Sequence, residues 1–316
     1  MNPSSPSYVR VVADHSAPLR RLMLNLLLRL TVKHAFKHDA DLAVLRNRNA
    51  SMDRRLAPRT SGMRRQAVDA GGVPAEWLSV PDSLAQRTLL YLHGGAFIFR
   101  TPNVHAAMVG SWCRQMKARA LMVDYRLAPE HPYPAAPDDC LAAYRWLLAQ
   151  GHAPGQIVIA GDSAGANLAL ATLVRIKAAG LAQPACALLL SPVVDFTMSS
   201  VSMVSNAASD PIFTLGALAT LRALYARPEQ FLNPDLSPLF ADLGGLPPLF
   251  FQASNSELLR DESLRGARHA HLAGVKVEVE LWQGMPHVFQ AVGALPQSRA
   301  ALASLLRFVA AHAGWA

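Results

Sequence analysis

The sequence predicts an α/β fold in which a mostly parallel sheet of about eight strands is covered by helices on both faces. Short apolar runs typical of buried strands alternate with Ala- and Leu-rich stretches typical of helices. Such alternation joins parallel strands through helical crossovers, and the functional sites of these sheets gather at the carboxyl ends of the strands. The predicted strands span residues 88–92, 120–124, 156–160, 187–190, 249–253 and 275–281, and the predicted helices span residues 104–118, 135–150, 164–179, 259–273 and 295–312.

Two further strands are expected at an edge of the sheet, at residues 64–68 and 76–80. Residues 195–246 interrupt the alternation with several prolines and one predicted helix near residues 215–226. A segment of this length between two strands is expected to be an insertion that forms a cap together with residues 1–50. The catalytic domain then consists of residues 51–194 and 247–316.

The composition is typical of a globular protein with a large core, because 51% of the 316 residues are hydrophobic. Cys113, Cys140 and Cys186 show neither paired nor metal-ligand spacing. No disulfide framework or zinc site is expected, and a reducing cytoplasm fits this cysteine usage. His34 and His38 have the i, i+4 spacing of metal ligands but lack a third ligand, so no metal or other cofactor is expected.

Positive charge is concentrated at the N-terminus. The net charge is +8, and residues 1–65 hold 13 Lys and Arg against 4 Asp and Glu, a balance of +9. A nucleic-acid surface would interleave basic residues with stacking aromatics, whereas this segment offers only Tyr8 and Phe36. Nucleic-acid binding is therefore not expected.

Residues 22–32 are rich in leucine but predict neither a signal peptide nor a membrane span, because Asn25 and Arg29 divide them into short apolar runs. As a helix, the segment would carry one narrow polar stripe, with Leu and Met over most of the remaining surface. Two interpretations stay open: the helix packs on the body of the protein, or it is a lid that also touches lipid or an apolar substrate. The stripe consists of Arg21, Asn25, Arg29, Lys33 and Lys37.

Ser163 is the candidate nucleophile. It lies in a Gly-x-Ser-x-Gly pattern from Gly161 to Gly165, between a predicted strand and a predicted helix. Small residues at the two glycine positions permit a strained turn that projects the hydroxyl above the sheet. Asp162, beside the nucleophile, is expected either to support the site or to be a plain surface residue.

Gly94 and Gly95 follow the predicted strand 88–92 and are candidates for an oxyanion hole. Backbone without Cβ atoms can turn its N–H groups toward a bound carbonyl oxygen, and the N–H of Ala164 would complete the set. His93 is expected to hold this loop by a hydrogen bond rather than to act as a base.

His287 is the candidate base, because it follows the last predicted strand and nucleophile-elbow enzymes run in the chain order Ser, acid, His. The acid must orient the imidazole and stabilise its charged form. Glu257, just beyond the predicted strand 249–253, is the first candidate, with Asp261 and Asp195 as alternatives.

Four motifs carry a family resemblance. They are His93-Gly94-Gly95-Ala96-Phe97, the proline-rich residues 124–136, the Gly161–Gly165 pattern, and Gly284-Met285-Pro286-His287-Val288-Phe289. From about residue 85 to the C-terminus the chain resembles the bacterial hormone-sensitive-lipase-like esterases of the α/β-hydrolase fold.

The resemblance implies Ser163 as nucleophile, His287 as base and an acid at position 257. Many relatives carry Asp followed by Pro at the acid position, where this chain has Glu257-Leu258, and a third glycine where it has Ala96. The N–H of Ala96 survives that change, so the oxyanion hole is expected to persist. Residues 124–136 are expected to be architectural, and the resemblance suggests a homodimer through the strand edge at residues 275–281.

These observations predict a serine carboxylesterase that acts on a small-molecule ester with short to medium acyl chains. A lactone hydrolase, a deacetylase or an acyltransferase would use the same residues, and a non-enzymatic small-molecule receptor on the same scaffold is the remaining alternative. Aromatic and aliphatic side chains near the motifs are candidates for pocket walls or for core positions: Phe97, Phe213, Leu215 and Phe289.

Overall fold

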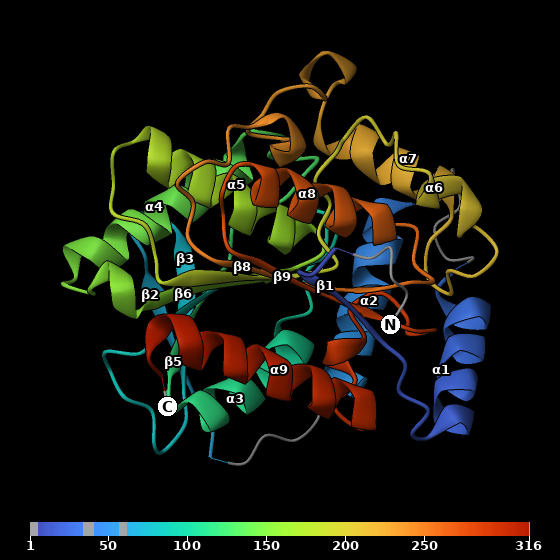
Figure 1. The fold of residues 1–316 in the computed structure, drawn as a ribbon, viewed down its shortest axis with the longest axis horizontal. Helices are drawn as coiled ribbons and strands as arrows, with labels where there is room; N and C mark the ends of the chain where they lie inside the picture. Colours follow the sequence, from blue (N-terminus) through green and yellow to red (C-terminus); the bar gives the residue numbers. More distant parts are fainter. Residues whose placement is uncertain (1–5, 34–40, 57–61, 316) are drawn as a thin grey trace.

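The computed structural model describes residues 6–33, 41–56 and 62–315. Its centre is a nine-stranded sheet with the order β1-β9-β8-β7-β6-β4-β5-β3-β2 (Figure 1). β3 pairs antiparallel with β2 and with β5, and the other pairs are parallel. The strands are β1 (Val9–Val12), β2 (Arg64–Asp69), β3 (Pro74–Ser79), β4 (Thr88–Leu92), β5 (Arg119–Val123), β6 (Ile157–Asp162), β7 (Cys186–Leu190), β8 (Leu249–Ser254) and β9 (Val277–Trp282).

Helices cover both faces of the sheet, as predicted. α4, α5 and α8 lie over one face, α3 and α9 lie over the other, and α6 and α7 belong to the segment between β7 and β8 (Figure 1). The helices are α1 (Pro18–Thr31), α2 (Leu42–Leu56), α3 (Pro102–Met116), α4 (Ala135–Ala149), α5 (Ala164–Ala178), α6 (Ser202–Ser205), α7 (Leu215–Tyr225), α8 (Arg260–Leu272) and α9 (Pro296–Ala313).

The central strands are buried on both sides, which explains their continuous apolar runs. Every residue of β4, β6, β7 and β8 is buried. Because successive side chains point to opposite faces, neighbours along a strand enter different cores. Leu90 and Phe251 belong to the cluster beneath α4 and α5, whereas Leu89 and Phe250 belong to the cluster beneath α3 and α9.

The ninth strand was not predicted. β1 pairs in parallel with β9, with Val9 opposite Val279 and Val12 opposite Trp282. The strand edge at residues 275–281, expected to carry a homodimer contact, is therefore already occupied by the chain's own N-terminal segment, and the expectation for that edge is wrong. A β-branched run at residues 9–12 was the available sequence signal.

α1 packs on the body of the protein through its polar stripe. The polar stripe faces inward: Arg21 and Asn25 donate to the carbonyls of Gln283 (3.2 Å) and Gly284 (3.0 Å), and Arg29 donates to that of Ser209 (2.7 Å). No residue of α1 is buried. The stripe position Lys37 and the two histidines at 34 and 38 lie outside the described residues.

Candidate active site

Ser163 occupies the turn between β6 and α5. Its backbone has φ 54° and ψ −119°, an unusual conformation for a residue with a side chain. The Ser163 N–H donates to the carbonyl of Leu190 on the neighbouring strand (2.7 Å), which holds the turn. Gly165 has to be glycine, because a Cβ there would lie 2.0 Å from the carbonyl oxygen of Leu92. The sequence pattern therefore produces the expected sharp turn.

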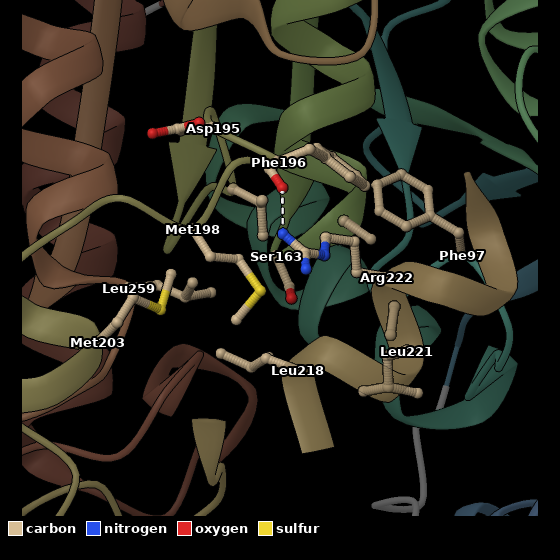
Figure 2. Close-up of a pocket in the computed structure, with 13 residues that line it drawn as sticks. Phe97, Ser163, Asp195, Phe196, Met198, Met203, Leu218, Leu221, Arg222 and Leu259 are labelled. Atoms are coloured by element: carbon tan, nitrogen blue, oxygen red, sulfur yellow. Dashed lines mark hydrogen bonds between the residues drawn. The ribbon is translucent and has the colours of Figure 1, made fainter. Parts of the chain in front are cut away.

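The Ser163 side chain opens into a cavity with an apolar lining (Figure 2). Within the described part of the chain its hydroxyl forms no hydrogen bond, so it is free to meet a bound molecule. Two charged residues, Arg222 and Asp195, also line the cavity. Nη1 of Arg222 donates to the carbonyl of Phe196 (2.7 Å), and Asp195 pairs with Arg265. The apolar lining includes Phe97, Val193, Phe196, Met198, Met203, Leu218, Leu221 and Leu259.

Of the four predicted pocket residues, Phe97 lines this cavity. Phe213 instead contacts the imidazole of His287 edge-on, with ring centroids 5.0 Å apart. Leu215 is 41% exposed at the start of α7. Phe289 belongs to a separate buried cluster and lies against Trp282, with ring centroids 5.4 Å apart. The last three are therefore not among the residues that line this cavity, and Phe289 takes the core position that the sequence left open as the alternative.

His287 and Glu257 form a buried pair. Nδ1 of His287 lies 2.5 Å from Oε2 of Glu257, and the carboxylate is fully buried. Its other oxygen, Oε1, accepts hydrogen bonds from the Ser191 hydroxyl (2.9 Å) and the Ser254 N–H (2.7 Å). Burial alone would lower the pKa of His287, but the hydrogen bond and charge of Glu257, together with Asp210, raise it above its ordinary value.

The two alternative acids are engaged elsewhere. Asp261 accepts from the Ser202 N–H (2.9 Å) and pairs with Arg260 (2.7 Å). Asp195 pairs with Arg265 (2.7 Å) and accepts from the hydroxyl of Ser199 (2.6 Å). Glu257 is therefore the one of the three candidates that the fold brings to His287.

The expectation that Gly94 is an oxyanion donor is wrong, because its N–H donates to Oδ1 of Asp162 (2.8 Å). Gly94 is required for a different reason: a Cβ there would lie 2.1 Å from Oδ2 of the same carboxylate. Gly95 (φ 121°) and Ala96 (φ 56°) turn the next part of the loop toward the cavity. In the residues that the structure describes, the N–H groups of Gly95, Ala96 and Ala164 form no hydrogen bond.

Comparison with known proteins gives the family of this chain. Residues 89–291 match the model of a family with the alpha/beta hydrolase fold. An esterase of Acinetobacter venetianus is 38% identical over 256 residues, which is 80% of this chain and 84% of that protein. An acetyl-hydrolase of Streptomyces hygroscopicus is 37% identical over 236 residues, which is 74% of this chain and 79% of that protein.

Solved structures give the same result. A crystal structure of an esterase from the bacterial hormone-sensitive lipase family has a TM-score of 0.87 at 34% identity and covers 96% of this chain and 100% of its own. A hormone-sensitive lipase from a metagenome library has a TM-score of 0.88 at 35% identity and covers 93% and 98%. The chain belongs to the bacterial hormone-sensitive-lipase-like family of α/β-hydrolase esterases. It is a carboxylic ester hydrolase.

In this esterase a buried polar cluster supports the turn at Ser163 and the loop of residues 93–97, which is called the oxyanion loop below after its expected role. Asp162 accepts from the Tyr91 hydroxyl and the Gly94 N–H, and it pairs with Nε2 of His105 (3.3 Å). Burial, the largest effect, would raise the pKa of Asp162, but the charge of His105 and the hydrogen bonds lower it to about 2. Asp162 therefore supports the site, and no sequence motif pointed to its partner His105.

His93 is a neutral member of the oxyanion loop. Burial, together with the nearby His105, lowers the pKa of His93 to about 4. Its Nδ1 lies 2.7 Å from the carbonyl of Gly94, and its ring stacks on Tyr125 with centroids 4.2 Å apart. A neutral imidazole with this contact donates a hydrogen bond that fixes the loop, which is the structural role predicted for it.

The proline-rich residues 124–136 contact α4, α2 and the oxyanion loop. Arg126 pairs with Asp139 at the start of α4 (2.7 Å), and Glu130 pairs with Arg46 of α2 (2.6 Å). The Ala128 N–H donates to the carbonyl of Phe97 (2.9 Å), at the end of the oxyanion loop. These contacts agree with the architectural role expected for this motif.

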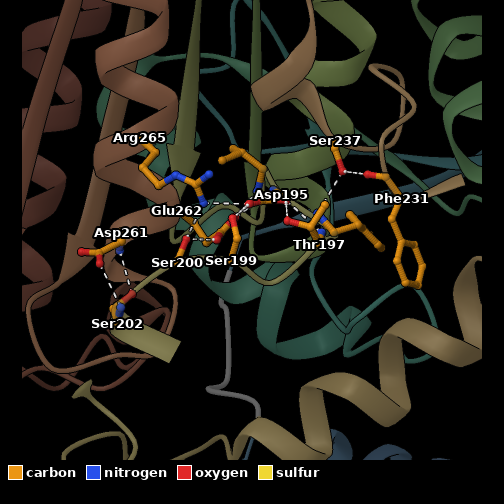
Figure 3. A network of polar contacts seen from close by, with 12 residues as sticks. Asp195, Thr197, Ser199, Ser200, Ser202, Phe231, Ser237, Asp261, Glu262 and Arg265 are labelled. Atoms are coloured by element: carbon orange, nitrogen blue, oxygen red, sulfur yellow. Dashed lines mark hydrogen bonds and ion pairs between the residues drawn. The ribbon is translucent and has the colours of Figure 1, made fainter. Parts of the chain in front are cut away.

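A second polar network holds the loop that forms one wall of the cavity (Figure 3). Glu262 is fully buried and accepts hydrogen bonds from the N–H groups of Val194 (2.9 Å) and Asp195 (2.8 Å) and from the Ser200 hydroxyl. Burial raises the pKa of Glu262 to about 7. Because Val193, Phe196 and Met198 line the cavity, Glu262 fixes the shape of that wall.

The described residues contain no group of three or more His, Cys, Asp or Glu side chains arranged to hold a metal ion. None of the helices in the described ranges combines the length and apolar character needed to cross a bilayer. The three cysteines are free and buried.

Proposed function

We propose that this esterase hydrolyses short- to medium-chain acyl esters through an acyl-enzyme formed on Ser163. The observation that carries the proposal is the buried contact between His287 and Glu257 (2.5 Å). A carboxylate that accepts from Nδ1–H leaves Nε2 as the basic nitrogen, and this is the tautomer that a serine nucleophile needs.

In the proposed reaction, Ser163 Oγ attacks the ester carbonyl while its proton moves to Nε2 of His287. The N–H groups of Gly95, Ala96 and Ala164 donate to the developing oxyanion. The tetrahedral intermediate expels the alcohol, which takes the proton from the imidazolium. Water then attacks the acyl-enzyme with His287 again as base, releasing the carboxylic acid and restoring the serine.

The apolar cavity supports an acyl chain as the group that lies beside Ser163. A kinetic panel of p-nitrophenyl esters from acetyl to dodecanoyl tests the chain-length range, and activity that rises steadily to the longest chain would contradict it. We also propose that α1, α2 and the segment with α6 and α7 form the cap that limits this range.

Replacing Ser163 with Ala tests the nucleophile. We expect loss of p-nitrophenyl acetate hydrolysis and of labelling by a fluorophosphonate, and residual activity within tenfold of the wild type would refute the assignment. A wild-type protein that binds esters but is neither labelled nor active would favour the receptor alternative. Product analysis with added alcohol or amine separates a hydrolase from an acyltransferase.

A further inference from the structure

α1 is an amphipathic helix whose apolar face points away from the protein. Leu24 and Leu28 lie toward the protein and are partly buried. The other six leucine and methionine side chains of α1 follow the spacing i, i+3, i+4, i+7, i+8, i+11, which places them on one face. All six are more than half exposed: Leu19 (73%), Leu22 (64%), Met23 (70%), Leu26 (54%), Leu27 (57%) and Leu30 (70%). These six residues are called the α1 apolar face below. Soluble proteins rarely expose a contiguous row of this kind without a binding role.

The orientation of the helix is fixed by its other face. Arg21, Asn25 and Arg29 bind backbone carbonyls, and Nζ of Lys33 donates to the carbonyls of Ala207 (2.8 Å) and Asp210 (2.6 Å). Rolling the helix to bury its leucines would break these charge-assisted hydrogen bonds and expose the carbonyls again. The apolar face therefore stays available to a partner outside the described structure.

Charge indicates which partner fits. Residues 1–65 carry a balance of +9, and α1 itself contains no Asp or Glu. Arg20 is exposed at the start of the helix and forms no ion pair within the described residues. An apolar row flanked by positive charge is complementary to a bilayer that contains anionic lipids, where the leucines enter the acyl boundary and the cations meet the headgroups.

A second copy of the chain fits the α1 apolar face less well than a lipid surface does. In a symmetric dimer the same patch meets its own copy, so the N-terminal segment with its balance of +9 would face itself. Like charges that face each other across an interface oppose association. A bilayer requires no matching shape, and the narrow face is sufficient for shallow insertion.

We propose that the α1 apolar face docks this esterase on anionic lipid surfaces. The contacts of the inward polar stripe place α1 beside the candidate active site, with the apolar face on the outer side of the helix. Gln283 and Gly284, which accept from α1, lie just before His287, and Asp210 accepts through Oδ2 from the Leu258 N–H (2.8 Å), next to Glu257. A docked molecule would thus present its catalytic loops close to the lipid surface. The proposal concerns binding and does not depend on the chemistry proposed for Ser163.

Co-sedimentation of the full chain with vesicles tests the proposal without any turnover. Wild-type protein is expected to bind vesicles of equal parts phosphatidylcholine and phosphatidylglycerol, and to bind them less in high salt. Leu22→Ser with Leu26→Ser should lower the partition coefficient at least about tenfold, because two side chains no longer gain from leaving water. The matched control is Leu232→Ser with Leu272→Ser, at similarly exposed leucines (66% and 69%), and it should bind like the wild type.

Far-UV circular dichroism and the thermal unfolding midpoint of each variant show that it is folded. Equal sedimentation of the two double variants would overturn the proposal, as would absence of wild-type binding or equal binding to pure phosphatidylcholine. Sedimentation equilibrium without lipid tests the alternative that a second copy of the chain binds the α1 apolar face. A wild-type dimer that becomes a monomer in the Leu22/Leu26 variant would assign the face to a second copy instead.

Discussion

Replacing Glu257 with Gln tests the acid by changing one atom of the pair. In the wild type, Oε1 accepts from the Ser254 N–H and the Ser191 hydroxyl, and Oε2 lies against Nδ1 of His287. An amide oxygen in the Oε1 position keeps the first two hydrogen bonds. The amide NH₂ then faces Nδ1 and donates to it, so that the imidazole carries its proton on Nε2. That tautomer cannot accept a proton from Ser163.

The magnitude follows from two contributions. Turning the amide to restore the correct tautomer would leave the buried Ser254 N–H without an acceptor, at a cost of about 1–3 kcal/mol. Even in that orientation the neutral oxygen stabilises the imidazolium less than a carboxylate does, by about 2–3 kcal/mol. The two together give about 3–6 kcal/mol, a loss of roughly 10²–10⁴ in kcat/KM.

The assay is steady-state hydrolysis of p-nitrophenyl acetate, with far-UV circular dichroism to show an intact fold. Asp261→Asn is the matched control, since Asp261 was the leading alternative acid and its contacts are to Ser202 and Arg260. We expect the control to stay within a few-fold of the wild type. Activity of Glu257→Gln within tenfold of the wild type would refute the reasoning about the tautomer.

Three further predictions concern ionisation. Because the pKa of His287 is raised and only its neutral form is a base, kcat/KM should fall on the acid side with a midpoint above 6.5; a midpoint below 6.5 would contradict this. The pKa of Asp162 is lowered from 3.8 to about 2, so its negative charge stabilises the native state above pH 4. At pH 7 the free energy of unfolding of Asp162→Asn should therefore be about 2 kcal/mol lower than that of the wild type. In urea unfolding this deficit should disappear as the pH falls toward 2, and an unchanged midpoint at pH 7 would argue against it. Burial raises the pKa of Glu262 from 4.5 to about 7. The folded protein therefore favours the protonated carboxyl, and its contribution to the free energy of unfolding decreases by on the order of 3 kcal/mol as the pH rises from about 4.5 to about 7. Glu262→Gln should gain stability relative to the wild type between pH 5 and 7, and parallel thermal stability curves for the two proteins would count against the effect.

Much of the fold and the three candidate catalytic side chains could be read from the sequence, because each has a local or ordered signature. Ser163 lies in a strand-turn-helix pattern, and His287 and Glu257 each follow a buried strand. Parallel strands end at one edge of the sheet, so the order of the strands was enough to expect these residues at one edge, and the contact of His287 with Glu257 agrees with this. The choice of Glu257 over Asp261 needed only the position of the strand end.

What could not be predicted depended on which partner a group meets in three dimensions. Periodicity gives the two faces of α1 but not which one packs inward, and carbonyls of residues 207–210 and 283–284 decided that. His105 has no motif and became visible only through its contact with Asp162. For Phe289 the sequence left a pocket wall and a core position open, and only the fold shows that it belongs to a buried cluster with Trp282.

The hydrogen bond of Gly94 with Asp162 holds the loop after β4 at a fixed position relative to the turn at Ser163. Asp162 is the last residue of β6 and immediately precedes Ser163, and its side chain accepts the Gly94 N–H of the loop after β4. One buried carboxylate thus ties the nucleophile's turn to the oxyanion loop. A catalytic hydrogen bond is sensitive to sub-ångström displacement of its donor. The first glycine of the motif therefore serves the loop's position, and in the proposed reaction the N–H groups of Gly95 and Ala96 remain for the oxyanion.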